Sequence, residues 1–121
     1  MVRNAQGEVL VARRHDHLHQ GGLWEFPGGK IHDGESGFEA LCRELAEELA
    51  IRVEAAEPLI DIEHHYADKA VRLEVWTVTA FTGAPRGLQQ QPLAWRIVEA
   101  LDPADFPAAN AAIIAALHAG A

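Results

Sequence analysis

Three glutamates of this chain stand at a spacing that suits metal chemistry. Glu44, Glu47 and Glu48 fall at positions i, i+3 and i+4, so in a helix their carboxylates lie along one face. Like charges at this spacing destabilise an isolated helix by roughly 0.2–0.5 kcal/mol per pair. A hard divalent cation binds carboxylate oxygens and would offset that repulsion. Taken alone, the pattern is more often a solvated acidic helix face.

The residues around the glutamates predict the helix that carries them. Leu41, Leu45 and Leu49 recur at i, i+4 and i+8 with Phe38 beside them, which gives an apolar stripe facing a core. The stretch that begins at Trp24 predicts a short strand followed by a glycine-rich turn. Residues 24–51 therefore predict a strand, a turn and an amphipathic helix.

The spacing within this stretch resembles the Nudix box, the signature of Nudix hydrolases. Gly29, Glu35 and the run 43–51 occupy the fixed positions of the box. Only Ala50 departs from it, because the family has glycine there. That glycine ends the helix, where left-handed backbone is common, so Ala50 bears on the local turn more than on the chemistry.

The resemblance implies a metal site. Glu47 and Glu48 are then direct ligands of Mg²⁺, with Mn²⁺ as an alternative. Glu44 is a ligand or the group that accepts a proton from water. A backbone carbonyl of the glycine turn, from Gly28 or Gly29, joins them.

The box also places Arg43 among the catalytic residues. Arg43 can reach Glu47 at i+4, or Glu35 and Glu39 on the preceding turns. We expect it to fix the geometry of loop and helix rather than to take part in the chemistry.

Outside the box the chain resembles the MutT group, which hydrolyses 8-oxo-dGTP to the monophosphate and pyrophosphate. The matching segments are 12–14, 24–30, 66–69, 91–95 and 105–110. In that group, the residues that surround or gate the nucleotide match Arg14, Phe26, Asp68 and Asn110.

Each of these four residues also has a plainer interpretation. Phe26 can be a core residue, Arg14 a surface cation at a strand end, Asp68 a turn former and Asn110 a helix N-cap. Asn110 is the most informative, because an amide offers both donors and an acceptor. 8-Oxoguanine carries a proton on N7 beside the O6 acceptor, whereas guanine has a bare N7. One amide therefore pairs with both groups of the oxidised base only, and such mismatches discriminate strongly.

One position departs from the MutT pattern. That pattern has a glutamate two residues before the Gln91-Pro92 dipeptide, where this chain has Gln89, and no carboxylate occurs in 83–98. Glutamine ligates weakly and cannot accept the water proton. Either Glu44 acts as the base, or the protein is slower than its relatives, or its substrate differs.

Composition narrows the class of protein. A length of 121 residues predicts one domain over 1–121, and 49% hydrophobic with 23% charged residues is ordinary for a globular protein. The net charge of −8 argues against a nucleic-acid polymer as partner, although a nucleotide can bring its phosphates with Mg²⁺. No apolar run approaches ~18 residues and no signal segment is recognisable, so we expect a cytoplasmic protein that is not membrane-bound. Cys42, the only cysteine, is expected to be a small core residue in a reducing compartment.

The predicted elements follow the order β-β-β-α-β-β-β-α. Outside the box, strands are expected over 1–4, 8–12, 58–65, 71–81 and 93–98, and a helix from Asn110 to about His118. The strand over 71–81 is apolar on both faces from Trp76 on, which places it centrally in the sheet. Residues 15–22 are expected to form a polar, metal-free loop. This order predicts an α/β fold with a mixed sheet between two helices, which is the Nudix α/β/α sandwich that the resemblance implies.

The sequence thus predicts a metal-dependent nucleoside triphosphate pyrophosphohydrolase that prefers 8-oxo-dGTP and cleanses the nucleotide pool. Its partner is expected to be this small molecule, with no nucleic-acid polymer and no membrane, and the protein a monomer. The alternatives are the same chemistry on CTP or another nucleotide, and a weakly catalytic Nudix domain that binds a nucleotide or a partner protein.

Overall fold

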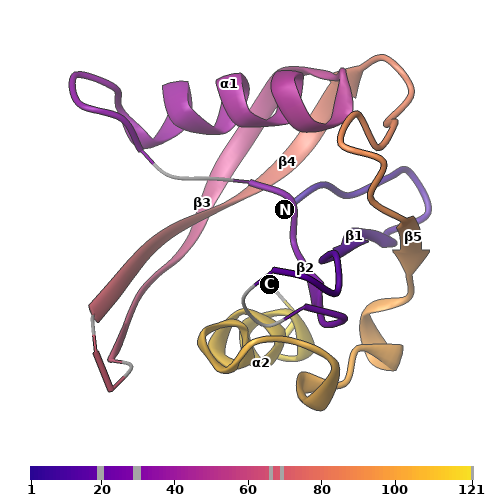
Figure 1. Ribbon diagram of the computed structural model, residues 1–121. Coiled ribbons are helices and arrows are strands. Elements are labelled where there is room, and N and C mark those ends of the chain that lie inside the picture. The colour runs from indigo at the N-terminus through magenta and orange to yellow at the C-terminus, as the bar shows by residue number, and fades with distance from the viewer. Residues whose placement is uncertain (19–20, 29–30, 66, 69, 121) are drawn as a thin grey trace.

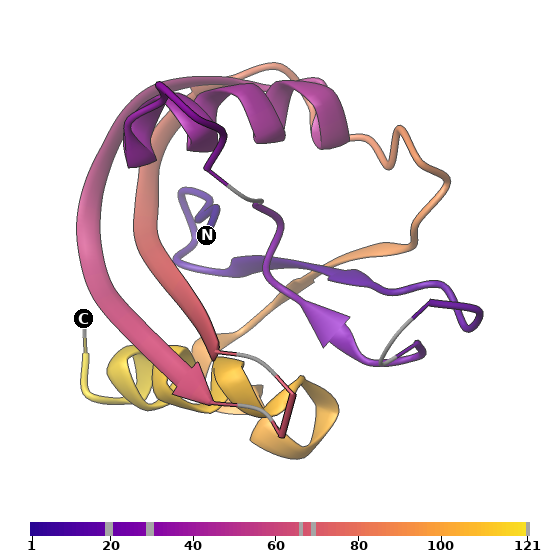
Figure 2. The same cartoon turned by 60° about the vertical axis from the view of Figure 1, so that its left-hand side comes forward.

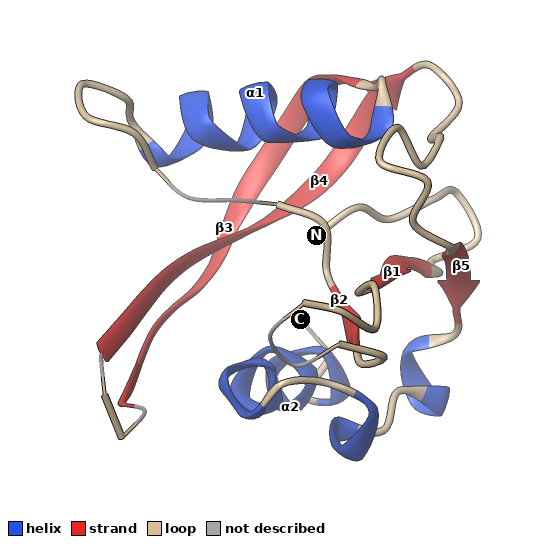
Figure 3. Cartoon of the chain, viewed as in Figure 1, coloured by secondary structure: helices blue, strands red, loops and turns tan. Residues whose placement is uncertain are grey.

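Helices cover both sides of the strands (Figure 1). The computed structural model describes residues 1–18, 21–28, 31–65, 67–68 and 70–120. Its strands and α-helices are β1 (Val9–Arg13), β2 (Trp24–Glu25), α1 (Gly37–Leu49), β3 (Arg52–His65), β4 (Ala70–Thr82), β5 (Leu93–Arg96) and α2 (Ala111–His118). Three short 3₁₀ helices precede α2, namely η1 (Val98–Ala100), η2 (Pro103–Asp105) and η3 (Ala108–Asn110). Figure 3 shows α1 on one side of the strands and α2 on the other, as predicted for an α/β fold.

The strands form two hydrogen-bonded groups. β1 is the middle strand of an antiparallel sheet in the order β2-β1-β5, and β3 pairs with β4 along a curved two-stranded ribbon (Figure 2). A parallel bridge between Val2 and Val78 connects the two groups. The Leu10 N–H donates to the Val2 carbonyl at 2.9 Å, and the Val78 N–H donates to the Met1 carbonyl at 2.8 Å. The predicted mixed sheet is therefore present, with its parallel contact confined to this bridge in the described residues.

Several boundaries differ from the prediction. β3 begins at Arg52 rather than at Pro58, because Ala- and Glu-rich residues with weak strand propensity pair with the far end of β4. β5 ends at Arg96, and Val98 already belongs to η1. The expected strand over 1–4 contributes isolated bridges at Val2 and Arg3. The central position expected for β4 holds only around Val78, which bridges to Val2, and Trp76, whose carbonyl accepts from the Met1 amino group at 2.9 Å; elsewhere in the described residues β4 pairs with β3 alone.

Two apolar clusters fill the molecule, one on each side of β1. Val9 and Val11 point toward α2, whereas Leu10 points toward α1, as the alternation of a strand requires. The three leucines of the predicted stripe of α1 are buried, since Leu45 and Leu49 are fully covered and Leu41 is 8% exposed, but Phe38 at the start of the helix is 37% exposed. Within the described residues, no helix is long and apolar enough to cross a membrane. Burial of this stripe fixes the rotation of α1 about its axis, and with it the face on which the glutamates lie.

Candidate active site

The N-terminus of α1 is closed by a capping box. The Ser36 Oγ accepts a hydrogen bond from the Glu39 N–H at 3.1 Å, and the Glu39 carboxylate accepts one from the Ser36 N–H at 2.9 Å. Two backbone donors that a helix end leaves unpaired are thereby satisfied. The helix start is fixed, so the later glutamates have a defined position along the axis.

Arg43 ties the preceding loop to α1. Its Nε donates to Glu35 Oε2 at 2.7 Å and its Nη2 donates to Glu35 Oε1 at 3.0 Å, a two-pronged contact. The Glu35 carboxylate also accepts the His32 N–H at 2.8 Å. The hydrogen bonds from Arg43, supported by the one from His32, lower the pKa of Glu35 to about 2. This is the geometry expected of Arg43 as a positioning residue.

The same guanidinium reaches two of the three glutamates. Arg43 Nη1 lies 2.8 Å from Glu44 Oε1 and 3.3 Å from Glu47 Oε2. The Glu44 side chain is only 14% exposed, whereas that of Glu47 is 60% exposed. The hydrogen bonds that Arg43 donates to Glu35 and Glu44 raise the pKa of Arg43, so the cation persists across the physiological range. Arg43 therefore neutralises part of the negative charge of Glu44 and Glu47.

Glu48 differs from Glu35 in the direction of its pKa shift. Burial raises its pKa to about 7, and the negative charges of Glu44 and Glu25 act in the same direction. A hydrogen bond with Glu44 also favours the protonated form, while the Gly28 N–H donates to Glu48 and opposes the shift. Glu48 is thus held partly protonated near neutral pH, beside two further carboxylates.

The donor set at this point fits a hard divalent cation. Among the described residues, no three His, Cys, Asp or Glu side chains are already arranged as a metal cage. Glu44 and Glu47, two of the expected ligands, instead form ion pairs with Arg43. Glu25, Glu44 and Glu48 nevertheless bring excess negative charge together at the backbone of Gly28, and Mg²⁺ or Ca²⁺ binds such oxygen donors. Gly29, the other expected carbonyl donor, lies outside the described residues.

Sequence reasoning missed Glu25. It lies in β2, at the point where that strand enters the glycine turn, and its charge raises the pKa of Glu48 on α1. The only sequence signal was its place directly before Phe26 and the turn.

A cleft of about 400 Å³ opens beside α1. Its lining includes Arg14, Phe26, Gly28 and Asn110, together with Ala40 of α1. Three of the four expected nucleotide contacts are thus brought to one cavity, although they lie on separate parts of the chain. Asp68 does not line it. It lies exposed in the β3–β4 connection, because the long ribbon carries that turn to its far end.

The three residues in the cleft differ in how they are held. Arg14 Nη1 lies 3.0 Å from Glu25 Oε2. Phe26 stacks on Phe106 with ring centroids 5.0 Å apart, so it is both a core contact and a wall of the cleft. Asn110 directly precedes α2 but makes no side-chain capping bond. Asn110 therefore occupies the N-cap position of α2 without the side-chain bond of a capping residue, and its side-chain amide has no hydrogen bond to another described residue.

Comparison with known proteins gives the family. The family model described as NUDIX domain matches residues 1–116. The chain belongs to the NUDIX domain family. The 8-oxo-dGTP diphosphatase of Escherichia coli K12 is 36% identical to this Nudix protein over 117 residues, which is 97% of this chain and 91% of that protein. The CTP pyrophosphohydrolase of the same strain is 37% identical over 106 residues, or 84% of this chain and 78% of that protein.

A solved structure agrees with the sequence relatives. A MutT structure from work on Aliivibrio salmonicida and Vibrio cholerae superposes with a TM-score of 0.82 at 33% identity, covering 99% of this chain and 93% of that one. The predicted family and fold are confirmed, and the protein is an enzyme of the Nudix hydrolase kind. Nudix hydrolases generally use divalent metal ions, which agrees with the carboxylates around Glu48.

In this Nudix hydrolase, the loop that carries Gln89 docks on the C-terminal end of α1 (Figure 1). The Leu88 N–H and the Gln91 side chain both donate to the Glu48 carbonyl, at 3.1 and 3.3 Å. His15 Nε2 lies 3.0 Å from the Gln89 carbonyl, a contact that sequence reasoning also missed. Gln89 itself is exposed. The loop therefore stands beside the carboxylate-bearing end of α1 without bringing a carboxylate to it.

Proposed function

We propose that this Nudix hydrolase cleaves 8-oxo-dGTP to the monophosphate and pyrophosphate with Mg²⁺, and so removes an oxidised nucleotide from the pool. The observation that carries the proposal is the Asn110 amide, which lines the cleft without a hydrogen bond to any other described residue. The same cleft is lined by Gly28, whose N–H meets Glu48. The amide proposed to read the base therefore borders a cleft whose lining, at Gly28, contacts Glu48 of α1.

Base recognition follows from the donors and acceptors of the amide. Its carbonyl can accept from the N7–H of 8-oxoguanine while its NH₂ donates to O6. Ordinary guanine presents a bare N7 to that carbonyl, and two acceptors then face each other. Phe26 supplies an apolar wall and Arg14 a cation in the same cleft. The proposed preference for the oxidised base therefore rests on a polar mismatch rather than on size.

The carboxylates of α1 are proposed to act on the phosphate groups of the nucleotide. Glu44, Glu47 and Glu48 with the backbone of Gly28 are the residues that would hold Mg²⁺. When bound, such an ion neutralises phosphate charge and lowers the pKa of water. Glu48 must give up its proton to serve as a ligand. Glu44, on the same helix face, is proposed to accept the proton from water, and Arg43 holds its carboxylate at 2.8 Å.

A substrate panel tests the proposal. We would measure kcat/KM for 8-oxo-dGTP, dGTP, CTP and 5-methyl-dCTP with Mg²⁺ and identify the products by chromatography. Asn110→Ala should lower the preference for 8-oxo-dGTP over dGTP by about 1–3 kcal/mol, because a paired buried group is lost. Basal hydrolysis and the melting temperature should change little, since the amide makes no cap.

Gln6→Ala is the matched control, because it removes an exposed amide in the turn before β1. It should leave the substrate ratio unchanged. An unaltered ratio in Asn110→Ala would show that this amide does not read the base.

CTP is the second candidate substrate. The observation that favours it is the 37% identity to a CTP pyrophosphohydrolase, as high as the identity to the 8-oxo-dGTP enzyme. A higher kcat/KM for CTP than for 8-oxo-dGTP would identify CTP as the preferred substrate. Release of less than one pyrophosphate per protein would instead identify a nucleotide-binding domain with little catalysis.

A further inference from the structure

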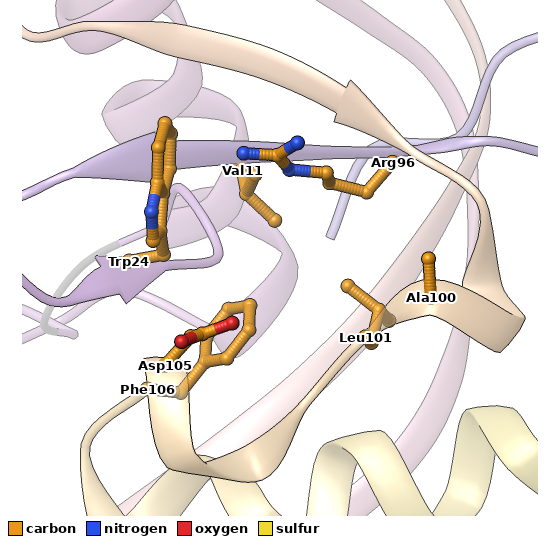
Figure 4. A pocket seen from close by; sticks show the side chains of 7 residues that line it. All are labelled: Val11, Trp24, Arg96, Ala100, Leu101, Asp105 and Phe106. Atoms are coloured by element: carbon orange, nitrogen blue, oxygen red, sulfur yellow. The ribbon is translucent and has the colours of Figure 1, made fainter.

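A second pocket lies on the α2 side of the three-stranded sheet (Figure 4). It has a volume of about 180 Å³, and its lining residues include Val11, Trp24, Arg96, Leu101, Asp105 and Phe106. Among the described residues, none lines both this pocket and the cleft beside α1. The stacked pair of Phe26 and Phe106 separates the two cavities, since one ring lines the cleft and the other lines the pocket.

Opposite charges face this small space. The Arg96 guanidinium carbon lies 5.0 Å from the centroid of the Trp24 ring, a cation–π contact. Figure 4 shows Arg96 and Asp105 reaching toward the pocket from different segments, with Trp24 along one side. Within the described part of the chain, neither Arg96 nor Asp105 takes part in an ion pair. A fork of donors and a pair of acceptor oxygens are therefore available to one ligand.

We propose that this pocket binds a guanine-type base, with its sugar left in solvent. Guanine presents two acceptors, O6 and N7, on one edge, and these match the two-pronged donors of Arg96. Its N1–H and N2–H groups are two adjacent donors, which match the two oxygens of the Asp105 carboxylate. The Trp24 indole offers an aromatic surface to the flat ring.

The size of the pocket supports a base rather than a larger ligand. Sites for drug-sized molecules measure ~300–1,000 Å³, so about 180 Å³ suits a single ring system. Adenine lacks the O6 acceptor and the adjacent donor pair. 8-Oxoguanine replaces the N7 acceptor with a donor that faces the Arg96 donors. The pocket therefore selects unoxidised guanine, the opposite of the preference proposed for Asn110.

Guanosine in metal-free protein provides the test, because it has no phosphate to be hydrolysed. We would titrate it against ¹⁵N-labelled protein in EDTA and follow the assigned Trp24 indole N–H. We expect the Trp24 indole N–H resonance to shift saturably in the parent protein. In each of Asp105→Asn and Arg96→Gln, guanosine should bind at least about tenfold more weakly than in the parent. Adenosine and 8-oxoguanosine should bind at least about tenfold more weakly than guanosine to the parent protein.

Two controls separate the pocket from the cleft. Glu99→Gln removes an exposed carboxylate on η1 that does not line the pocket and should leave guanosine binding unchanged. Asn110→Ala alters the cleft and should also leave it unchanged. These results do not depend on whether the proposed hydrolysis of 8-oxo-dGTP is correct, because no residue assigned to it lines the pocket.

Three outcomes would overturn the proposal. The first is the absence of saturable guanosine binding in the millimolar range. The second is binding that is lost in Asn110→Ala and kept in both pocket variants, which would place guanosine in the cleft. The third is equal affinity for adenosine and guanosine, which would reduce the contact to unspecific stacking. Backbone spectra of Asp105→Asn and Arg96→Gln confirm folding, which exposed side chains should not disturb.

Discussion

The two ends of α1 differ in how their charged groups are paired. At the N-terminal end, the Ser36 capping box and the Arg43–Glu35 contact satisfy backbone donors and charges, and the pKa of Glu35 falls to about 2. At the C-terminal end, burial and neighbouring carboxylates raise the pKa of Glu48 to about 7. There Ala50 also adopts a left-handed backbone, with φ 59° and ψ 33°, that suits glycine better.

The difference contrasts an end whose polar groups are paired with an end that keeps negative charges close together. At the N-terminal end these backbone donors and charges have partners. The second end retains repulsion that a bound cation would relieve, which is typical of sites that must bind charge. Substitutions that remove one feature from either end test this contrast.

Glu48→Gln should abolish most turnover. Replacing an anionic ligand by a neutral amide should lower turnover by about 10²-fold or more at saturating Mg²⁺, while the fold is kept. Without metal the melting temperature should stay the same or rise, because repulsion with Glu44 and Glu25 is removed. Steady-state kinetics and thermal unfolding in EDTA give both numbers.

Glu39→Gln is the matched control at the opposite end of the same helix. Glutamine keeps the capping box and removes one charge, so turnover should be nearly unchanged. Near parental activity in Glu48→Gln would remove Glu48 from the ligand set.

The two ends should also give opposite dependences of stability on pH in metal-free protein. The folded pKa of Glu48 is raised from 4.5 to about 7, so its contribution to the free energy of unfolding is lost as pH rises through that range. After allowance for its partial exposure, the loss should be about 1–3 kcal/mol. The folded pKa of Glu35 is lowered from 4.5 to about 2, so its contribution is lost as pH falls from 4.5 toward 2.

Urea unfolding of the parent, Glu48→Gln and Glu35→Gln in EDTA from pH 2 to 8 resolves the two contributions. At each pH, the free energy of unfolding of the variant is subtracted from that of the parent. The difference reports the substituted group alone, because the other titrating groups are shared. The Glu48 difference should appear above pH 4.5 and the Glu35 difference below it. A Glu48 difference that is flat between pH 4.5 and 7 would contradict the raised pKa.

The helix α1 and its buried face were largely predictable, whereas the charge environment at its C-terminal end was not. Leu41, Leu45 and Leu49 are local and periodic, and their burial follows the predicted stripe. The role of Glu25 depends on β2 meeting α1, which no spacing within either element reveals. Asp68 matched a motif, yet the length of the β3–β4 ribbon carries it away from the cleft. Local periodicity thus specified elements, whereas charge environments required the tertiary structure.

Ala50→Gly should stabilise the C-terminal end modestly. A left-handed residue with a Cβ costs roughly 1–2 kcal/mol, and glycine avoids that cost but loses about 0.5–1 kcal/mol of chain entropy. We expect a net gain of about 0.5–1 kcal/mol in the free energy of unfolding, measured in urea. Ala46→Gly, one turn earlier in the helix interior, should instead destabilise by about 1 kcal/mol. Equal losses in both variants would show that Ala50 is not strained.

Gln89→Glu should have the smallest effect, although it restores the carboxylate of the MutT pattern. The loop is held through backbone atoms: the Gln89 N–H donates to Gln91 Oε1 at 2.9 Å, and the Gln89 carbonyl lies 3.0 Å from His15 Nε2. These bonds position the loop and leave the side chain at 89 exposed. Glu44, by contrast, shares a helix face with Glu48 and is fixed by Arg43. We therefore expect less than about tenfold gain in turnover from Gln89→Glu, and a loss of about 10²–10⁴-fold from Glu44→Gln. The pH–rate profiles of the parent and both variants decide between the two positions, since a gain of about 10²-fold or more from Gln89→Glu would move the base from the helix to the loop.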